Sequence, residues 1–428
     1  MNPIRIYDYC FDRIHLWIQY DRKSIGFIEV VIEVFYPSAR NAEGLVMFSH
    51  GFLIGNDPFF YLKKITGAFT GDNPLFGIKP SHYYNYTQAI VERNWAMACV
   101  SASHLQFEGV PWLDFGGNPR VGQDAYAAAS YLIKYGATDF FYKLDDHKRH
   151  STKAFLEEIK KYRFMKPGCN NVIFAGHSVG GAHAQVAACG FDTMNKIGQQ
   201  TGYTFDPVMY DREFLPRYSD RMSEWKDEER AKPVGLLQFS PVDQQIPLFA
   251  PGMQAYREAL SQKPMPILMI VGECDCACLD SNAIQKPPAW SPDPSVTSQF
   301  SQLAPPGGSS WAVVANVERG SHCGYLTADS PLCSLADGQD QCKRSVGKNP
   351  YKACGEESVF STMLLKELIG SCPVKSRKDP SVDGDFCDWL NSGCLKWLDS
   401  KNPGGILNMV PFPDGSHIDY SGKPNRCP

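Results

Sequence analysis

Short apolar runs alternate with helix-forming stretches along most of this chain. Continuous apolar runs occupy 45–48, 95–100, 172–175, 234–239, 267–271 and 311–317, and residues 27–36 are rich in β-branched and aromatic side chains. Runs of this length predict buried strands. Patterns typical of helices lie at 83–92, 123–135, 152–163 and 358–369. Buried strands separated by helices indicate an α/β fold, with a mostly parallel central sheet and helices on both faces.

The length of 428 residues is sufficient for one large domain with an appendage. We assign 1–370 to the main domain and 371–428, which has little hydrophobic periodicity and several cysteines, to a cysteine-rich C-terminal appendage packed on it. Glycines, prolines and aromatic residues interrupt 53–82, which reads as an insertion. Residues 191–232 are polar and contain a charged run at 224–230. They are either a lid or a solvated helical face.

Charge and hydropathy exclude two classes of partner. The formal net charge is −4, without the clustered basic surface typical of nucleic-acid binding. No apolar run is long enough for a transmembrane segment, and charges are scattered through 1–21, so no signal peptide is recognisable. The oligomeric state stays open.

Cysteine is unusually frequent, with 15 in the chain and most of them from Cys274 onward. This density predicts disulfides and a secreted or otherwise extracytoplasmic location. A metal site at Cys274, Cys276 and Cys278 is the alternative, but no second pair with zinc-ligand spacing accompanies them. Because the total is odd, at least one thiol is unpaired within the chain, and Cys99 and Cys189 in their apolar surroundings are the candidates.

The motif Gly176-His177-Ser178-Val179-Gly180 follows the apolar run 172–175 and precedes the small-residue run 181–188. This order predicts a strand, a sharp turn and a helix, with the Ser178 hydroxyl exposed at the end of a sheet. Flanking glycines permit close approach of neighbouring backbones. We therefore expect Ser178 to be a nucleophile.

A serine nucleophile needs a base and an acid that orients it. His322 follows the run 311–317 and is the expected base, whereas His417 lies in the irregular tail and is expected at the surface. Asp275 follows the run 267–271 and is the preferred acid. Asp243, after the run 234–239, is the alternative acid or else a residue of a turn or the substrate cleft.

Backbone N–H groups are expected to stabilise the oxyanion. One belongs to Val179, directly after the nucleophile, and the other to Phe52, in the loop after the run 45–48. His50 and His177 flank turns, and we interpret both as packed, hydrogen-bonded loop residues rather than as metal ligands or bases.

These motifs together resemble the α/β-hydrolase superfamily over residues 25–370. The segments that carry the resemblance are Phe48–Phe52, Gly176–Gly181, Gly272–Asp275 and Gly320–Cys323. Within the superfamily they are most similar to cutinase-like polyester hydrolases and their chlorophyllase and platelet-activating-factor acetylhydrolase relatives. The resemblance implies Ser178, Asp275 and His322 as nucleophile, acid and base.

It also implies Phe52 and Val179 as oxyanion donors, with the Phe52 ring as one wall of the acyl cleft. In some of these relatives the acid follows the earlier strand, where this chain has Asp243.

The sequence therefore predicts a serine carboxylic-ester hydrolase that acts on a hydrophobic ester, small or polymeric, without a metal or organic cofactor. A lipase or chlorophyllase-like hydrolase of long-chain esters is the alternative among enzymes. A non-catalytic binding protein built on the same fold is the alternative from another class.

Overall fold

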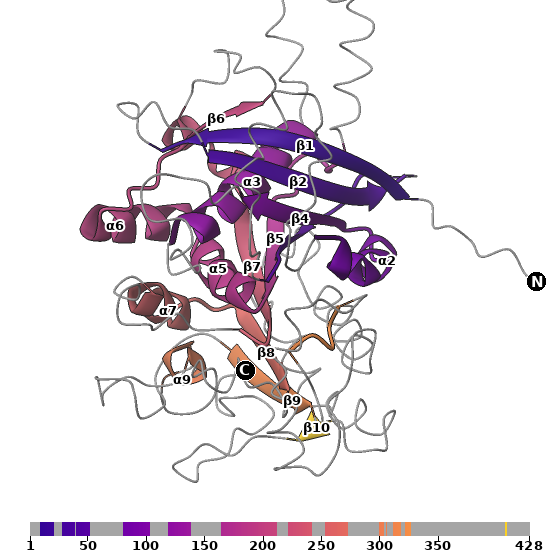
Figure 1. Ribbon diagram of the computed structural model, residues 1–428. Coiled ribbons are helices and arrows are strands. Elements are labelled where there is room, and N and C mark those ends of the chain that lie inside the picture. The colour runs from indigo at the N-terminus through magenta and orange to yellow at the C-terminus, as the bar shows by residue number, and fades with distance from the viewer. Residues whose placement is uncertain are drawn as a thin grey trace, which may run out of the picture.

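A ten-stranded sheet forms the body of the molecule (Figure 1). The computed structural model describes residues 9–20, 28–38, 40–51, 80–102, 119–137, 164–211, 221–241, 253–272, 299–303, 305, 311–317, 322–326 and 407–408. The strands are β1 Tyr9–Gln19, β2 Ile28–Pro37, β3 Leu45–Ser49, β4 Ala96–Ala102, β5 Asn171–His177, β6 Val208–Asp211, β7 Lys232–Phe239, β8 Pro266–Gly272, β9 Trp311–Val317 and β10 Leu407–Asn408. Their order is β10-β9-β8-β7-β5-β3-β4-β2-β1-β6.

The described helical segments lie between these strands. The α-helices are α2 Thr87–Val91, α3 Pro119–Ala137, α5 Val179–Ala188, α6 Phe191–Thr201, α7 Met253–Ser261 and α9 Gln299–Leu303, and the 3₁₀-helices are η1 Pro80–Tyr86, η4 Met222–Glu224 and η5 Asp227–Glu229. Figure 1 shows α5, α6, α7 and α9 on one side of the sheet and α2 on the other. The expected α/β fold with helices on both faces is confirmed.

The six strands from β4 to β9 along the sheet, through β3, β5, β7 and β8, are parallel, and the remaining pairings are antiparallel. After β3 the chain adds β4 on one side, then returns to add β5 on the other. Such a reversal of strand order opens a crevice outside the carboxyl ends of the strands, which is where α/β sheets bind ligands. The topology thus predicts a ligand-binding crevice at the carboxyl ends of β3 and β5.

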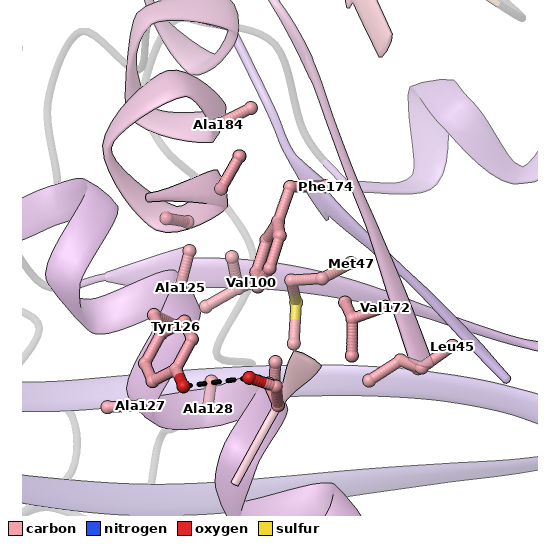
Figure 2. Close-up of a cluster of buried hydrophobic side chains, with 14 of the residues drawn as sticks. Leu45, Met47, Val100, Ala125, Tyr126, Ala127, Ala128, Val172, Phe174 and Ala184 are labelled. Atoms are coloured by element: carbon pink, nitrogen blue, oxygen red, sulfur yellow. Dashed lines mark hydrogen bonds between the residues drawn. The ribbon is translucent and has the colours of Figure 1, made fainter. Parts of the chain in front are cut away.

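Alternate residues of each strand pack on opposite faces of the sheet. On one face, side chains of β3, β4 and β5 pack against α3 and α5, as Figure 2 shows for Met47, Val100, Phe174 and Ala184. The Tyr126 hydroxyl of α3 donates to the Ala231 carbonyl oxygen at 2.7 Å, so this buried tyrosine is satisfied. On the other face, Phe48 and Phe239 are buried against the tyrosine rings of η1.

The structure confirms the strands predicted at 27–36, 45–48, 95–100, 172–175, 234–239, 267–271 and 311–317, with shifts at their ends. The helix-like stretch predicted at 83–92 is helical in the structure, with the 3₁₀-helix η1 followed directly by the short α2. Strand β1 was not predicted, although Ile14, Leu16 and Ile18 alternate and are buried. Their period of two is that of a half-buried strand.

Residues 191–232 contribute α6, β6, η4 and η5, and β6 pairs with β1 at one edge of the sheet. The charged run 224–230 forms 3₁₀ turns rather than a longer helix, and the lid stays a prediction. The predicted helices at 152–163 and 358–369, most of the insertion 53–82, and the appendage 371–428 apart from β10 lie outside the described residues. None of the described helices is long and apolar enough to span a membrane.

Candidate active site

Ser178 lies in a sharp turn between β5 and α5. Its backbone has φ 57° and ψ −128°, a conformation rarely adopted by residues other than glycine. The Ser178 N–H donates to the Phe239 carbonyl oxygen of β7 at 2.9 Å. Holding a residue in such a region costs about 1–3 kcal/mol and is concentrated at functional sites. The strand, turn and helix predicted from the motif are confirmed, and the turn is strained at the serine.

The motif glycines are required by close backbone contacts. A Cβ at Gly176 would lie 2.0 Å from the Gly180 carbonyl oxygen, and one at Gly180 would lie 2.2 Å from the Ser49 carbonyl oxygen. Such separations are far inside van der Waals contact, so neither position accommodates a side chain without movement. The glycines hold the start of α5 directly against the ends of β3 and β5.

Val179 is the first residue of α5, as expected for an oxyanion donor. The first N–H groups of a helix have no partner within the helix, and the positive end of the helix dipole favours an anion there. Phe52, the other expected donor, lies outside the described residues. Its neighbour Gly51 is described, and the Gly51 N–H donates to the Tyr83 hydroxyl oxygen at 2.9 Å.

His322 lies in the short turn 322–326 and is 4% exposed. Its carbonyl oxygen is 2.6 Å from Nε2 of His177, and the two imidazole rings are 4.7 Å apart between centroids. Because His177 directly precedes Ser178, the structure brings the segment of the expected base to the segment of the expected nucleophile. These segments are separated by 145 positions in the sequence.

The remaining predicted site residues, Asp275, Asp243 and His417, lie outside the described residues. The strands expected to present the two aspartates are described: β8 ends at Gly272, shortly before Asp275, and β7 ends at Phe239, shortly before Asp243. Both strands run parallel to β5. The choice between the two carboxylates therefore stays open.

His177 is fully buried, and its two ring nitrogens make different hydrogen bonds. Nε2 must donate to the His322 carbonyl oxygen, because a carbonyl can only accept. Burial, reinforced by the nearby imidazole of His322, lowers the pKa of His177 well below its usual range and keeps the ring neutral. In the neutral ring Nδ1 then accepts the proton of the Tyr83 hydroxyl, 2.7 Å away. The position of the proton on this imidazole is thus fixed by its neighbours.

Buried aromatic rings pack next to these hydrogen-bonded residues. Phe48 contacts Tyr83 and Phe239, with centroids 4.5 Å and 5.7 Å apart, and Tyr325 stacks on Phe239 at 5.3 Å. The Tyr86 hydroxyl donates to the Tyr325 carbonyl oxygen at 3.2 Å. Rings from η1, β3 and β7 therefore support the turn that contains His322.

A buried polar network lies behind α5. Nε of Arg257, on α7, donates to Oε1 of Gln185 at 2.7 Å, and Nε2 of Gln185 donates to Oε1 of Gln299 at 2.9 Å. Nε2 of Gln299 in turn donates to the Pro241 carbonyl oxygen at 3.2 Å. The network anchors the chain at Pro241, just after β7.

His50 is the packed, hydrogen-bonded loop residue that the sequence predicts, since it is buried and its Nδ1 lies 2.6 Å from the Gly51 carbonyl oxygen. His177 is also packed and hydrogen-bonded, but it is the last residue of β5 rather than a loop residue. Within the described ranges no group of three or more His, Cys, Asp or Glu could hold a metal ion.

Tyr83 was missed by sequence reasoning. Its only signal was the spacing of three from Tyr86, which places both rings on one side of a 3₁₀-helix, and both are fully buried.

The sequence matches no protein-family model and no curated protein. Among solved structures, the chain is similar to an esterase from Pseudomonas putida, with 13% identity and a TM-score of 0.40 over 86% of this chain and 85% of that one. It is similar to an S-formylglutathione hydrolase from Agrobacterium tumefaciens, with 11% identity and a TM-score of 0.38 over 85% of this chain and 96% of that one. It is also similar to a hyperthermophilic esterase from the archaeon Pyrobaculum calidifontis, with 11% identity and a TM-score of 0.36 over 85% of this chain and 85% of that one. Likenesses of this size carry no conclusion about activity.

Proposed function

We propose that this chain is a serine carboxylic-ester hydrolase of the α/β-hydrolase superfamily. The observation that carries the proposal is the strained turn at Ser178, where φ is 57° and two motif glycines press α5 against the ends of β3 and β5. A serine held in this way at the carboxyl end of a parallel strand presents its hydroxyl above the sheet. The burial of His322 beside this turn supports the same reading.

In the proposed mechanism the Ser178 hydroxyl oxygen attacks the ester carbonyl carbon while His322 takes the hydroxyl proton. The oxyanion of the tetrahedral intermediate accepts hydrogen bonds from the N–H groups of Val179 and Phe52. The alcohol leaves with the proton from His322, and an acyl group remains on Ser178. Water then attacks this acyl-enzyme while His322 takes the proton of the water. The bond between the acyl carbon and the Ser178 oxygen breaks, that oxygen receives the proton from His322, and the carboxylic acid is released. Asp275 orients the imidazole, and no metal or organic cofactor takes part.

The proposed substrate is a hydrophobic ester, because aromatic residues make up 12% of the chain and are frequent in the segment 53–82, directly after Phe52. A cutinase-like enzyme and a hydrolase of long-chain esters are distinguished by turnover of p-nitrophenyl acetate, p-nitrophenyl palmitate and chlorophyll. A preference for palmitate or chlorophyll would favour the lipase or chlorophyllase-like alternative.

A fluorophosphonate probe tests the proposal directly, because it reacts only with an activated serine. We expect one adduct per chain, at Ser178, and its loss in Ser178→Ala. Ser240 is the matched control, since it also has a positive φ and lies at the end of the neighbouring strand β7. The Ser240→Ala variant should still label. A folded wild-type protein without an adduct at Ser178 would support the non-catalytic binding protein instead.

The acid is assigned by comparing Asp275→Asn with Asp243→Asn. Loss of the carboxylate that orients the base costs on the order of 10⁴-fold in kcat in a well-studied serine protease triad. We therefore expect Asp275→Asn to reduce p-nitrophenyl acetate turnover by orders of magnitude and Asp243→Asn to have a small effect. The reverse order would transfer the role to Asp243.

We also propose that the protein is secreted or otherwise extracytoplasmic. Cys323, adjacent to His322, is disulfide-bonded, which supports the location inferred from cysteine content. Counting thiols in denatured protein before and after reduction tests this. Thiol reactivity of most of the 15 cysteines before reduction would contradict it.

A further inference from the structure

Three segments of the site are joined by one continuous chain of hydrogen bonds. The Gly51 N–H donates to the Tyr83 hydroxyl, that hydroxyl donates to Nδ1 of His177, and Nε2 of His177 donates to the His322 carbonyl oxygen, at 2.9, 2.7 and 2.6 Å. Gly51 precedes Phe52 after β3, and His177 precedes Ser178. The chain thus connects the loop of one oxyanion donor, the nucleophile turn and the segment of the base.

We infer that Tyr83 and His177 are positioning residues that set the backbone of His322 and of Gly51 relative to Ser178. This inference rests on the proposed function and adds to it a pair of residues with no direct part in the reaction. Neither residue needs to contact substrate. Each acts through the backbone group that it holds.

The geometry favours this role over simple packing because, in each of the three hydrogen bonds, only one partner can be the donor. The His322 carbonyl requires the proton on Nε2 of His177, so Nδ1 must accept from Tyr83, and the Tyr83 oxygen is free to accept from Gly51. Both residues are fully buried. Burial raises the pKa of Tyr83 well above its usual range, so its hydroxyl keeps the proton that it donates. No solvent molecule is needed to complete the chain.

The variants remove one link at a time. Tyr83→Phe keeps the ring on Phe48 and deletes the hydroxyl, and His177→Phe deletes both bonds of the imidazole. His177→Gln keeps one donor and one acceptor. Tyr126→Phe is the matched control, because Tyr126 is a buried tyrosine whose hydroxyl also donates to a backbone carbonyl, on the opposite face of the sheet.

We expect Tyr83→Phe and His177→Phe to lower both kcat for p-nitrophenyl acetate and the rate of fluorophosphonate labelling by about 10- to 100-fold, with KM changed little, since a misplaced catalytic group costs rate rather than binding. His177→Gln should recover part of the loss, and Tyr126→Phe should stay within about twofold of wild type. Folded Tyr83→Phe and His177→Phe proteins that label at the wild-type rate would overturn the inference. The inference would also be overturned if the kcat and labelling rate of His177→Gln were no higher than those of His177→Phe.

A measurement on the wild-type protein keeps the inference testable if these variants do not fold. Imidazole ¹⁵N shifts of histidine-labelled protein should show His177 with a protonated Nε2 and an unprotonated Nδ1. A protonated Nδ1 would contradict the chain whatever the activity. Failure of wild-type protein to label at Ser178 would instead remove the proposed function, and it leaves the hydrogen-bond chain to be judged by the spectrum.

Discussion

At the scale of single residues, the site combines a strained serine with a histidine whose protonation state is fixed. Ser178 adopts a φ of 57°, and the adjacent His177 is neutral because it is buried beside another imidazole. Within this motif, Ser178 is therefore constrained in its backbone conformation, whereas His177 is constrained in its protonation state by desolvation. Both depend on tertiary contacts, with Phe239 for Ser178 and with Tyr83 and His322 for His177.

The lowered pKa of His177 predicts a loss of stability in acid. In the unfolded chain His177 takes up a proton near its usual pKa of about 6.5, whereas in the folded protein it resists protonation. Below that pH the unfolded state binds more protons, so the contribution is complete above about pH 6.5 and declines as the pH falls, by up to ~1.4 kcal/mol per pH unit.

Urea unfolding of wild type and His177→Gln between pH 7 and pH 5 measures this contribution. The free-energy difference between the two proteins should shift in favour of the variant by about 1–2 kcal/mol over that range. A difference that is constant with pH would show that His177 titrates alike in both states.

At the scale of elements, α5 is the central piece of the site. It packs against β3, β5, β7, α3 and α7, and its first turn carries Val179 and Gly180. Two glycines permit two of these close contacts, Gly180 the contact of α5 with β3 and Gly122 the contact of α3 with α5. A Cβ at Gly180 would meet the Ser49 carbonyl oxygen at 2.2 Å, and one at Gly122 on α3 would meet the Val186 Cβ at 2.4 Å. Only the first contact lies at the carboxyl end of the sheet.

Alanine at these two positions separates stability from function. Gly180→Ala and Gly122→Ala should each destabilise the protein by about 1–3 kcal/mol, as overpacking does. Only Gly180→Ala moves α5 away from the end of β3, so it alone should slow fluorophosphonate labelling of folded protein, by about tenfold or more.

Thermal unfolding and labelling rates of the two variants at a temperature where both are folded give the comparison. Equal labelling rates would mean that the approach of α5 to β3 has no part in the activity of Ser178.

At the scale of the whole molecule, the sheet separates two apolar layers, and the unpaired cysteines within the described residues differ in their exposure. Cys99 and Cys189 are unpaired and buried, as expected from their apolar surroundings. Burial, with the Glu33 charge as a smaller cause, raises the pKa of Cys99 well above its usual range, and burial raises that of Cys189 to about 12. Cys10 on β1 is also unpaired but only half-buried.

These environments predict the order of thiol reactivity. The thiolate is the reactive form, so a buried thiol with a raised pKa reacts slowly. In native protein treated with iodoacetamide, Cys10 should be alkylated first, while Cys99 and Cys189 should react only after denaturation. Peptide mapping by mass spectrometry follows the three sites, with Cys10 as the internal control. Alkylation of Cys99 at the rate of Cys10 would contradict the structure.

The apolar runs predicted most of the parallel strands, because a strand buried on both faces has a continuous apolar sequence. The same signal failed for β1, where the alternation of apolar residues is interrupted by charges. Ser178 and Val179 were predicted from a local motif, although the conformation of Ser178 also depends on Phe239 of β7 and on the close approach of Gly180 to Ser49 of β3. The role of Tyr83 was invisible, because its partners Gly51 and His177 lie 32 and 94 positions away.

The sequence by itself determined the α/β class, the course of the central strands and the strand–turn–helix that holds Ser178, since these depend on hydrophobic periodicity and on glycines within one motif. Tertiary structure alone decided that His322 lies beside His177 and that Tyr83 joins His177 to Gly51. Hydrogen bonds between distant segments leave no periodic trace in a sequence, because each requires only one donor and one acceptor brought together by the packing of the sheet.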